Sequence, residues 1–129
     1  MALTLVDASI LIALLDSDDR LHTVAMAALL AHAGDELMIP ASAYSEALVR
    51  PARAGRLEEA KTVVSALLME VVPLTQPIAE MAAMLRARHQ SLRLPDALVI
   101  ATGTHLGAGS ILTGDTRWRG LAASIEVVG

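Results

Sequence analysis

Short apolar runs alternate with longer segments of helical periodicity along the whole chain. The apolar runs predict strands at Leu3–Val6, Glu36–Ile39, Glu70–Pro73, Gly109–Thr113 and Ile125–Val128. Helical spacing predicts helices from near Ile10, from Leu21 to about Ala33, from Pro40–Ser42, from about Leu57 to Leu68, from Thr75–Pro77, and from Asp96 to about His105. This alternation predicts an α/β fold with a central, mostly parallel sheet of four to five strands and helices on both faces. No repeat or linker interrupts it, so one domain over residues 1–129 is expected.

The composition predicts a hydrophobic core with almost no aromatic side chains. Hydrophobic residues make up 54% of the chain, but aromatic residues only 2%, so Ala, Leu, Val, Ile and Met must fill the core. The absence of cysteine excludes disulfides, zinc–thiolate sites and thiol nucleophiles, and it fits a reducing compartment. The apolar stretch 3–15 contains Asp7 and is followed by Asp16, so it predicts neither a membrane span nor a signal peptide. A cytoplasmic protein that does not enter the membrane is therefore expected.

Four acidic residues lie beside predicted core elements, where an unpaired charge is costly. Asp7 and Asp115 follow predicted strands, and parallel α/β sheets place their active sites beyond the carboxyl ends of strands. Asp96 opens the helix that Pro95 introduces. Glu46 lies inside an earlier helical stretch that could lean over the same edge. Together these acids predict one acidic metal site.

Each acid also has an ordinary structural explanation. Asp7 could cap a helix, and Asp96 could interact with the dipole of its own helix. Glu46 could pair with Arg50 one turn later, and Asp115 could be a turn residue. For each acid taken singly, the structural explanation is as plausible as a role in a metal site. The placement of all four acids relative to one edge favours the shared site.

The net charge fits such a site. The formal charge is −4 and the sequence pI is about 5.4, which argues against a broad basic face for duplex DNA. Leaving out the four acids would bring the charge from −4 to 0. The excess acidity of the chain is therefore no larger than one site that divalent cations would compensate.

In their order and local sequence, the four acids resemble those of the PIN-domain nucleases. The matching segments are Val6-Asp7-Ala8-Ser9, Ser45-Glu46-Ala47, Leu94-Pro95-Asp96-Ala97-Leu98-Val99-Ile100-Ala101 and Leu112-Thr113-Gly114-Asp115. The length of the chain resembles that of the compact toxin ribonucleases of the VapC type. The resemblance implies a single PIN-like domain whose catalytic, metal-binding residues are Asp7, Glu46, Asp96 and Asp115, supported by Ser9 and Thr113.

The resemblance further implies a metal-dependent endoribonuclease with Mg²⁺ or Mn²⁺ as cofactor, and carboxylate oxygens are ligands that these hard cations prefer. It implies RNA as substrate, a homodimer, and a cognate antitoxin that covers the site, as in VapBC-type toxin–antitoxin pairs. Arginines near the acids are the candidates for binding RNA phosphates: Arg50, Arg53, Arg93, Arg117 and Arg119. Trp118 could stack on an unpaired base, although a lone tryptophan more often fills the core.

Other classes of protein fit the sequence less well. A response-regulator receiver needs a lysine near the end of a late strand, but the only lysine, Lys61, lies in a predicted helix. A phosphatase with an aspartyl nucleophile would have a second aspartate where Ser9 stands. Two alternatives stay open within the resemblance. One is a PIN-like module that binds a partner without catalysis, and the other is a housekeeping RNA-processing nuclease.

Overall fold

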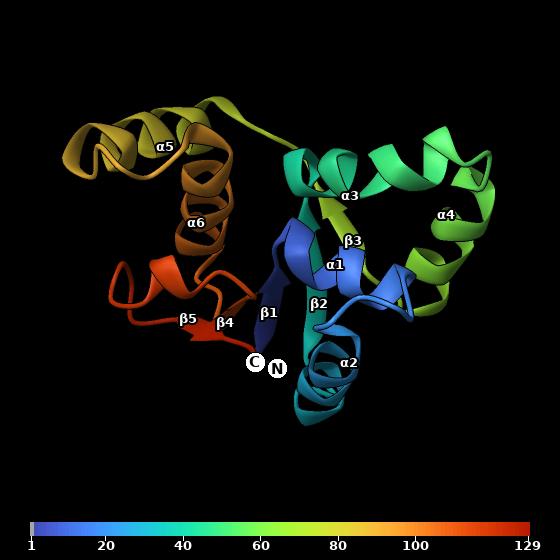
Figure 1. Ribbon diagram of the computed structural model, residues 1–129. Coiled ribbons are helices and arrows are strands. Elements are labelled where there is room, and N and C mark those ends of the chain that lie inside the picture. The colour runs from blue at the N-terminus through green and yellow to red at the C-terminus, as the bar shows by residue number, and fades with distance from the viewer. Residues whose placement is uncertain (1) are drawn as a thin grey trace.

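A parallel five-stranded sheet runs through the centre of the molecule (Figure 1). The computed structural model describes residues 2–129 and confirms the predicted α/β class. The strand order is β3-β2-β1-β4-β5, and every neighbouring pair is parallel. The strands are β1 (Leu3–Val6), β2 (Glu36–Pro40), β3 (Glu70–Val72), β4 (Ser110–Thr113) and β5 (Ile125–Val127). Each predicted strand is therefore present within one or two residues of its expected ends.

Six α-helices and one short 3₁₀ helix connect the strands. They are α1 (Ala8–Leu15), α2 (His22–Ala31), α3 (Ala41–Arg53), α4 (Leu57–Ala66), α5 (Gln76–Arg88), α6 (Leu94–Leu106) and the 3₁₀ helix η1 (Thr116–Trp118). Helix α1 begins two residues before the expected Ile10, because the Asp7 side chain accepts a hydrogen bond from the Ile10 amide and caps the first turn. Helix η1 was not expected from the sequence. Within residues 2–129, no helix combines the length and apolarity needed to cross a bilayer.

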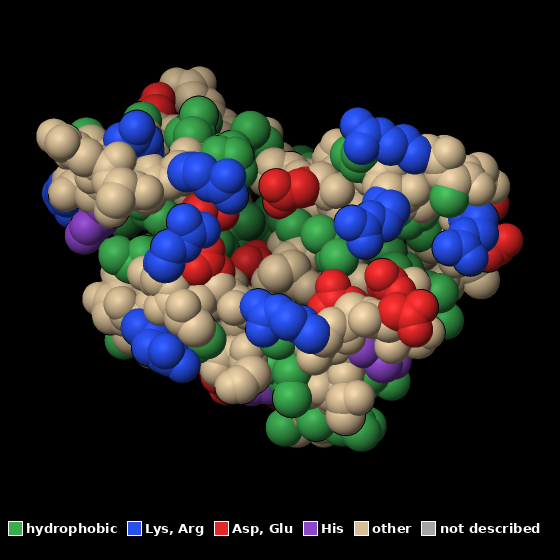
Figure 2. Space-filling model, viewed as in Figure 1, with side chains coloured by type: hydrophobic (Ala, Val, Ile, Leu, Met, Phe, Trp, Pro, Cys, Tyr) green, Lys and Arg blue, Asp and Glu red, His purple; other side chains and the backbone are tan. Residues whose placement is uncertain are grey.

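The carboxyl ends of β1 and β4 meet at one edge of the sheet. In the register of these strands Val6 pairs with Leu112, and the Asp7 amide donates to the Leu112 carbonyl at 3.0 Å. Residues that follow the two strands therefore emerge side by side. Over this edge the surface is hollowed between α6 and α3, and acidic side chains gather there with basic side chains around them (Figure 2).

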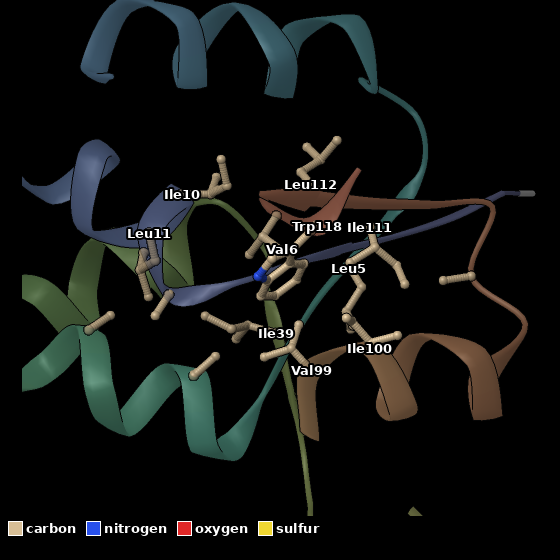
Figure 3. Close-up of a cluster of buried hydrophobic side chains, with 14 of the residues drawn as sticks. Leu5, Val6, Ile10, Leu11, Ile39, Val99, Ile100, Ile111, Leu112 and Trp118 are labelled. Atoms are coloured by element: carbon tan, nitrogen blue, oxygen red, sulfur yellow. The ribbon is translucent and has the colours of Figure 1, made fainter. Parts of the chain in front are cut away.

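The core is aliphatic, as the composition predicts, with one exception. Leu5 and Val6 of the central strand are fully buried, which explains the uninterrupted apolar run of β1. Trp118 is 1% exposed and is the largest side chain in the core. In Figure 3 the indole lies beside β1 and β4, with α2 on one side of the sheet and α3 and α6 on the other. Helices thus cover both faces, as predicted.

Candidate active site

Asp7 is buried at the point where β1 passes into α1. It is 6% exposed. Ser9 Oγ donates to one carboxylate oxygen at 2.5 Å, and Thr113 Oγ1 donates to the other at 2.7 Å. Burial raises the pKa of Asp7 from 3.8 to about 6, although these hydrogen bonds act in the opposite direction. The fold therefore fixes the orientation of a carboxylate while removing it from water.

Ser9 and Thr113 also connect the two strand ends to each other. Ser9 Oγ accepts a hydrogen bond from the Gly114 amide at 2.9 Å. Thr113 Oγ1 accepts one from the Asp115 amide at 3.0 Å. Each hydroxyl thus donates to Asp7 and accepts from the segment after β4. This network couples the position of Asp7 to the backbone of Asp115.

Asp96 and Asp115 form a second acidic group beside the first. Asp96 lies in the first turn of α6, and Asp115 caps η1. Burial raises the pKa of Asp96, and the negative charge of Asp115 raises it further, while Arg93 and Arg117 oppose both effects. The two acids line the same cavity, whose volume is about 220 Å³. The structure therefore brings this predicted pair together.

Arg117 forms an ion pair with the carboxylate of Asp115. Its Nε lies 3.0 and 3.2 Å from the two carboxylate oxygens, and one terminal nitrogen lies 2.6 Å from Oδ2. These hydrogen bonds lower the pKa of Asp115 and raise that of Arg117. Arg93 stands in a similar but looser relation to Asp96, with its Nε 3.7 Å from Oδ2. Each acid of this pair is thus partly neutralised by an arginine two or three residues away in the chain.

Glu46 differs in burial from the other three predicted acids, which are buried or half-buried. Its side chain is exposed and lines a groove between α1 and α3 together with Arg50 and Arg53. The alternative pairing of Glu46 with Arg50 is not observed, because Arg50 lies 3.7 Å from Asp16. Among residues 2–129, no three acidic or histidine side chains converge closely enough to form a ready metal cluster. The four acids therefore share a region without forming one compact group.

The chemistry of these side chains nevertheless suits a hard divalent cation. Carboxylates are the only anionic side chains offered, since the chain has no cysteine. Asp7 is buried with no basic partner among residues 2–129, and burial also raises the pKa of Asp96. A cation would offset that cost of burial. Asp7 and Asp96 fit the role of ligands as they stand, whereas Asp115 would first have to exchange Arg117 for the cation.

The other predicted contacts divide into exposed arginines and one buried aromatic side chain. All five candidate RNA-binding arginines are exposed: Arg50, Arg53, Arg93, Arg117 and Arg119. Trp118 is too deeply buried to stack on a base, so that expectation is wrong and the alternative of a core residue is confirmed. His89 and Ser91 were not predicted as site residues, although they line the cavity of Asp96 and Asp115. Their loop carries no motif, and only the fold brings it to the site.

Comparison with known proteins agrees with this architecture. The family model of the PIN domain matches residues 4–123. A toxin–antitoxin complex from Klebsiella pneumoniae contains a similar chain, with a TM-score of 0.82, 26% identity and 96% of each chain covered. No curated protein sequence matches significantly.

Two further structures share the fold at lower identity. VapC20 of Mycobacterium tuberculosis, described as a toxin that cleaves the sarcin–ricin loop, has a TM-score of 0.76 and 22% identity over 98% of this chain and 99% of its own. VapBC2 from Rickettsia felis, bound to a promoter DNA fragment, has a TM-score of 0.77 and 11% identity over 98% and 99%. At these identities the likeness concerns the fold alone.

Proposed function

This chain belongs to the PIN domain family, and on that premise we propose that it is a Mg²⁺- or Mn²⁺-dependent endoribonuclease, the toxin of a VapBC-type pair. The observation that carries the proposal is the buried, hydrogen-bonded Asp7 beside the pair Asp96 and Asp115 at the carboxyl edge of the sheet. Similarity to a chain of a toxin–antitoxin complex and to a toxin described as cleaving the sarcin–ricin loop supports it. A cytoplasmic location is part of the same proposal.

Asp7 and Asp96 would be the principal ligands of the cation, with Asp115 and Glu46 completing the site directly or through water. A cation held by these carboxylates would supply Lewis acidity to activate water and to offset negative charge on the phosphate and the leaving oxygen. Ser9 and Thr113 keep the Asp7 carboxylate oriented, because both of its oxygens accept from fixed hydroxyls. Since Asp7 has no basic partner among residues 2–129, its charge remains available to a ligand.

Arginines at the rim would hold the RNA backbone. Arg93 and Arg117 lie beside Asp96 and Asp115, so a phosphate that reaches the acids also reaches these guanidinium groups. Arginine suits this role because its planar group binds phosphate oxygens in pairs. Arg50 and Arg53 line the groove that leads away from Glu46, and Arg119 follows η1. Arg50, Arg53 and Arg119 would contact RNA phosphates farther from the cleaved bond.

An antitoxin and a second copy of the chain are the proposed protein partners. The similar chains from Klebsiella pneumoniae and Rickettsia felis are named as parts of toxin–antitoxin assemblies, which supports an antitoxin for this chain. Several large apolar side chains are exposed, among them Leu30, Leu68 and Met84. Such side chains are the usual material of protein interfaces. Light scattering of the purified protein would test the dimer, and a small adjacent reading frame would support the antitoxin.

A binding module without catalysis is the second candidate function. It is favoured by the ion pair between Arg117 and Asp115, and by Glu46, which lines a different groove from Asp96 and Asp115. A housekeeping RNA-processing enzyme would use the same site as the toxin and differs only in substrate. The family membership and the unpaired, buried Asp7 favour an active nuclease over a module that only binds.

Cleavage of a panel of structured and unstructured RNAs tests the proposal. The protein is assayed with Mg²⁺, with Mn²⁺ and with chelator, and Asp96→Asn is assayed alongside to exclude a contaminating nuclease. We expect cleavage by the wild type with metal only, and none by Asp96→Asn. Metal binding without cleavage of any RNA, in folded protein free of antitoxin, would instead favour the binding module.

A further inference from the structure

A small cavity opens directly beside Asp96 and Asp115. It is bounded by the loop that follows α5, by the start of α6 and by η1, and its volume is about 220 Å³. His89 and Ser91 contribute polar side chains to its wall, and Leu92 and Leu121 contribute apolar ones. This volume is below the roughly 300 Å³ at which pockets for drug-sized ligands begin. The cavity therefore fits a single small, flat group.

Two polar side chains of the wall, His89 and Ser91, are free to bind a ligand. Neither His89 nor Ser91 makes a side-chain hydrogen bond within residues 2–129. Leu92 and Leu121 offer the aliphatic surface that covers a flat ring. A nucleobase has apolar faces and a polar edge, so its chemistry matches this combination of walls.

Trp118 adds an unused donor at the base of the cavity. Its indole N–H is the one buried side-chain polar group within residues 2–129 that finds no hydrogen-bond partner. Trp118 lines the cavity, and in Figure 3 the indole nitrogen lies at the end of the ring nearer the carboxyl end of β1. A buried donor without an acceptor is costly, so an acceptor atom that reaches this N–H from the cavity would be stabilising.

We propose that this cavity binds one unpaired base of the RNA substrate, next to the phosphate held at Asp96 and Asp115. The inference rests on the proposed nuclease function. The carboxylates of Asp96 and Asp115 only accept hydrogen bonds, and the proposal assigns them to the phosphate and its cation. Of the other polar side chains of the wall, tryptophan and arginine only donate, and serine and histidine can also donate, so this part of the wall favours a base that presents carbonyl oxygens. Uracil and guanine carry such oxygens at their edges, whereas adenine carries none. The cavity thus selects uracil or guanine over adenine at one position beside the cut.

The only tryptophan of the chain provides the measurement. Trp118 fluorescence is followed while the intact protein, in chelator, is titrated with UMP, GMP and AMP. All three share the phosphate, so a difference among them reports the base. We expect a saturable change with UMP or GMP and binding of AMP about fivefold weaker, as for the loss of one hydrogen bond. Inorganic phosphate alone should leave the fluorescence unchanged.

Neighbouring residues of one loop separate the proposed role from a general effect of mutation. Ser91→Ala and His89→Ala should each reduce the preference for UMP or GMP over AMP. Gln90→Ala is the matched control, because Gln90 lies between them but lines a groove beside Ala83 and Arg86 of α5. The absence of a saturable change with any nucleotide, or an equal effect of Gln90→Ala, would overturn the proposal.

The cleavage assay keeps the two proposals distinguishable. Cleavage by wild type without any base preference in either assay would refute the base-binding cavity and leave the nuclease intact. A base preference in the fluorescence titration, together with no cleavage of any RNA, would keep the cavity and refute the nuclease.

Discussion

Asp7 carries its carboxylate at 6% exposure with no basic partner among residues 2–129, and this placement costs free energy. A pKa of about 6 in the folded protein, in place of 3.8, means that the folded state binds the proton more tightly than the unfolded chain. The contribution of Asp7 to stability is therefore fully present below about pH 3.8 and is lost as the pH rises through about 6. At neutral pH the loss is about 3 kcal/mol.

Replacing Asp7 with Asn should remove this cost together with the activity. The amide keeps an oxygen for the Ile10 amide, so the cap of α1 is retained. It leaves the Thr113 hydroxyl without an acceptor, which offsets about 1 kcal/mol of the increase in stability. We expect RNA cleavage to be abolished and the free energy of unfolding at neutral pH to rise by about 1–2 kcal/mol. Urea unfolding in chelator measures this, and a destabilised Asp7→Asn protein would contradict it.

Arg117 holds Asp115 in the place where a cation would bind, so the two should compete. Arg117→Ala is expected to bind Mn²⁺ about threefold more tightly, a modest gain because the ion pair is exposed to solvent. The same variant should bind RNA more weakly, since a phosphate contact is lost. Isothermal titration with Mn²⁺ tests the first effect without any RNA. Arg119→Ala is the control for net charge, and equal Mn²⁺ affinity of Arg117→Ala and wild type would refute the competition.

At the scale of elements, the regular pattern of the chain was sufficient to predict the fold. Buried strands such as β1 are continuous apolar runs. Pro40 is the N-cap of α3 and Pro95 lies in the first turn of α6, so these elements depend on local sequence. Helix η1 could not be predicted in this way. Three residues carry no periodicity, and the segment is fixed by the cap at Asp115 and by burial of Trp118.

Helix α6 packs closely on the sheet at Gly103, next to Ile111 of β4 and Leu5 of β1. A Cβ added at Gly103 would lie 2.8 Å from Ile111 Cγ1 and 3.3 Å from Leu5 Cδ2. Gly103→Ala should therefore destabilise the protein by about 1–2 kcal/mol, because overpacking costs more than the roughly 1 kcal/mol that alanine contributes to a helix. Urea unfolding measures the effect.

Adding Ile111→Val should relieve part of that clash, since it removes Cδ1, the Ile111 methyl group that the new carbon meets first, while Cγ1 remains. The double variant is then less destabilised than the sum of the two single variants. Additive effects would show that α6 can shift on the sheet without resistance, and that contact with Ile111 does not cause the loss of stability.

At the scale of the whole molecule, the site combines residues that the sequence keeps far apart. Asp7 and Asp115 were predictable because the ends of adjacent parallel strands share an edge. The position of Glu46 was not predictable from the sequence, because the tilt of α3 relative to this edge depends on its packing against α1 and α6. The contribution of His89 and Ser91 was hidden for the same reason. Which loop walls a cavity is a property of helix packing and leaves no periodicity in the sequence.

His32 is a second group whose titration affects the stability of the fold. His32, at the end of α2, lies 3.1 Å from Asp35 and 3.3 Å from Glu126 of β5, and Thr4 of β1 donates to Asp35 at 2.8 Å. Partial burial lowers the pKa of His32, but the two acids outweigh it and raise the pKa above the ordinary 6.5. The stability that His32 contributes is therefore fully present below about pH 6.5 and is lost as the pH rises through its folded pKa.

Asp7 and His32 together should give the metal-free protein its highest stability in mild acid. Both lose their contribution as the pH rises, whereas the lowered pKa values of Asp35 and Asp115 cost stability only below about pH 4. We expect the Tm in chelator to fall by several degrees between about pH 5 and about pH 8. His32→Gln should flatten the upper part of this fall and Asp7→Asn the lower part, while His105→Gln, at an exposed histidine of α6, should change neither. A Tm that rises steadily toward pH 8 would mean that neither group dominates the pH dependence of folding.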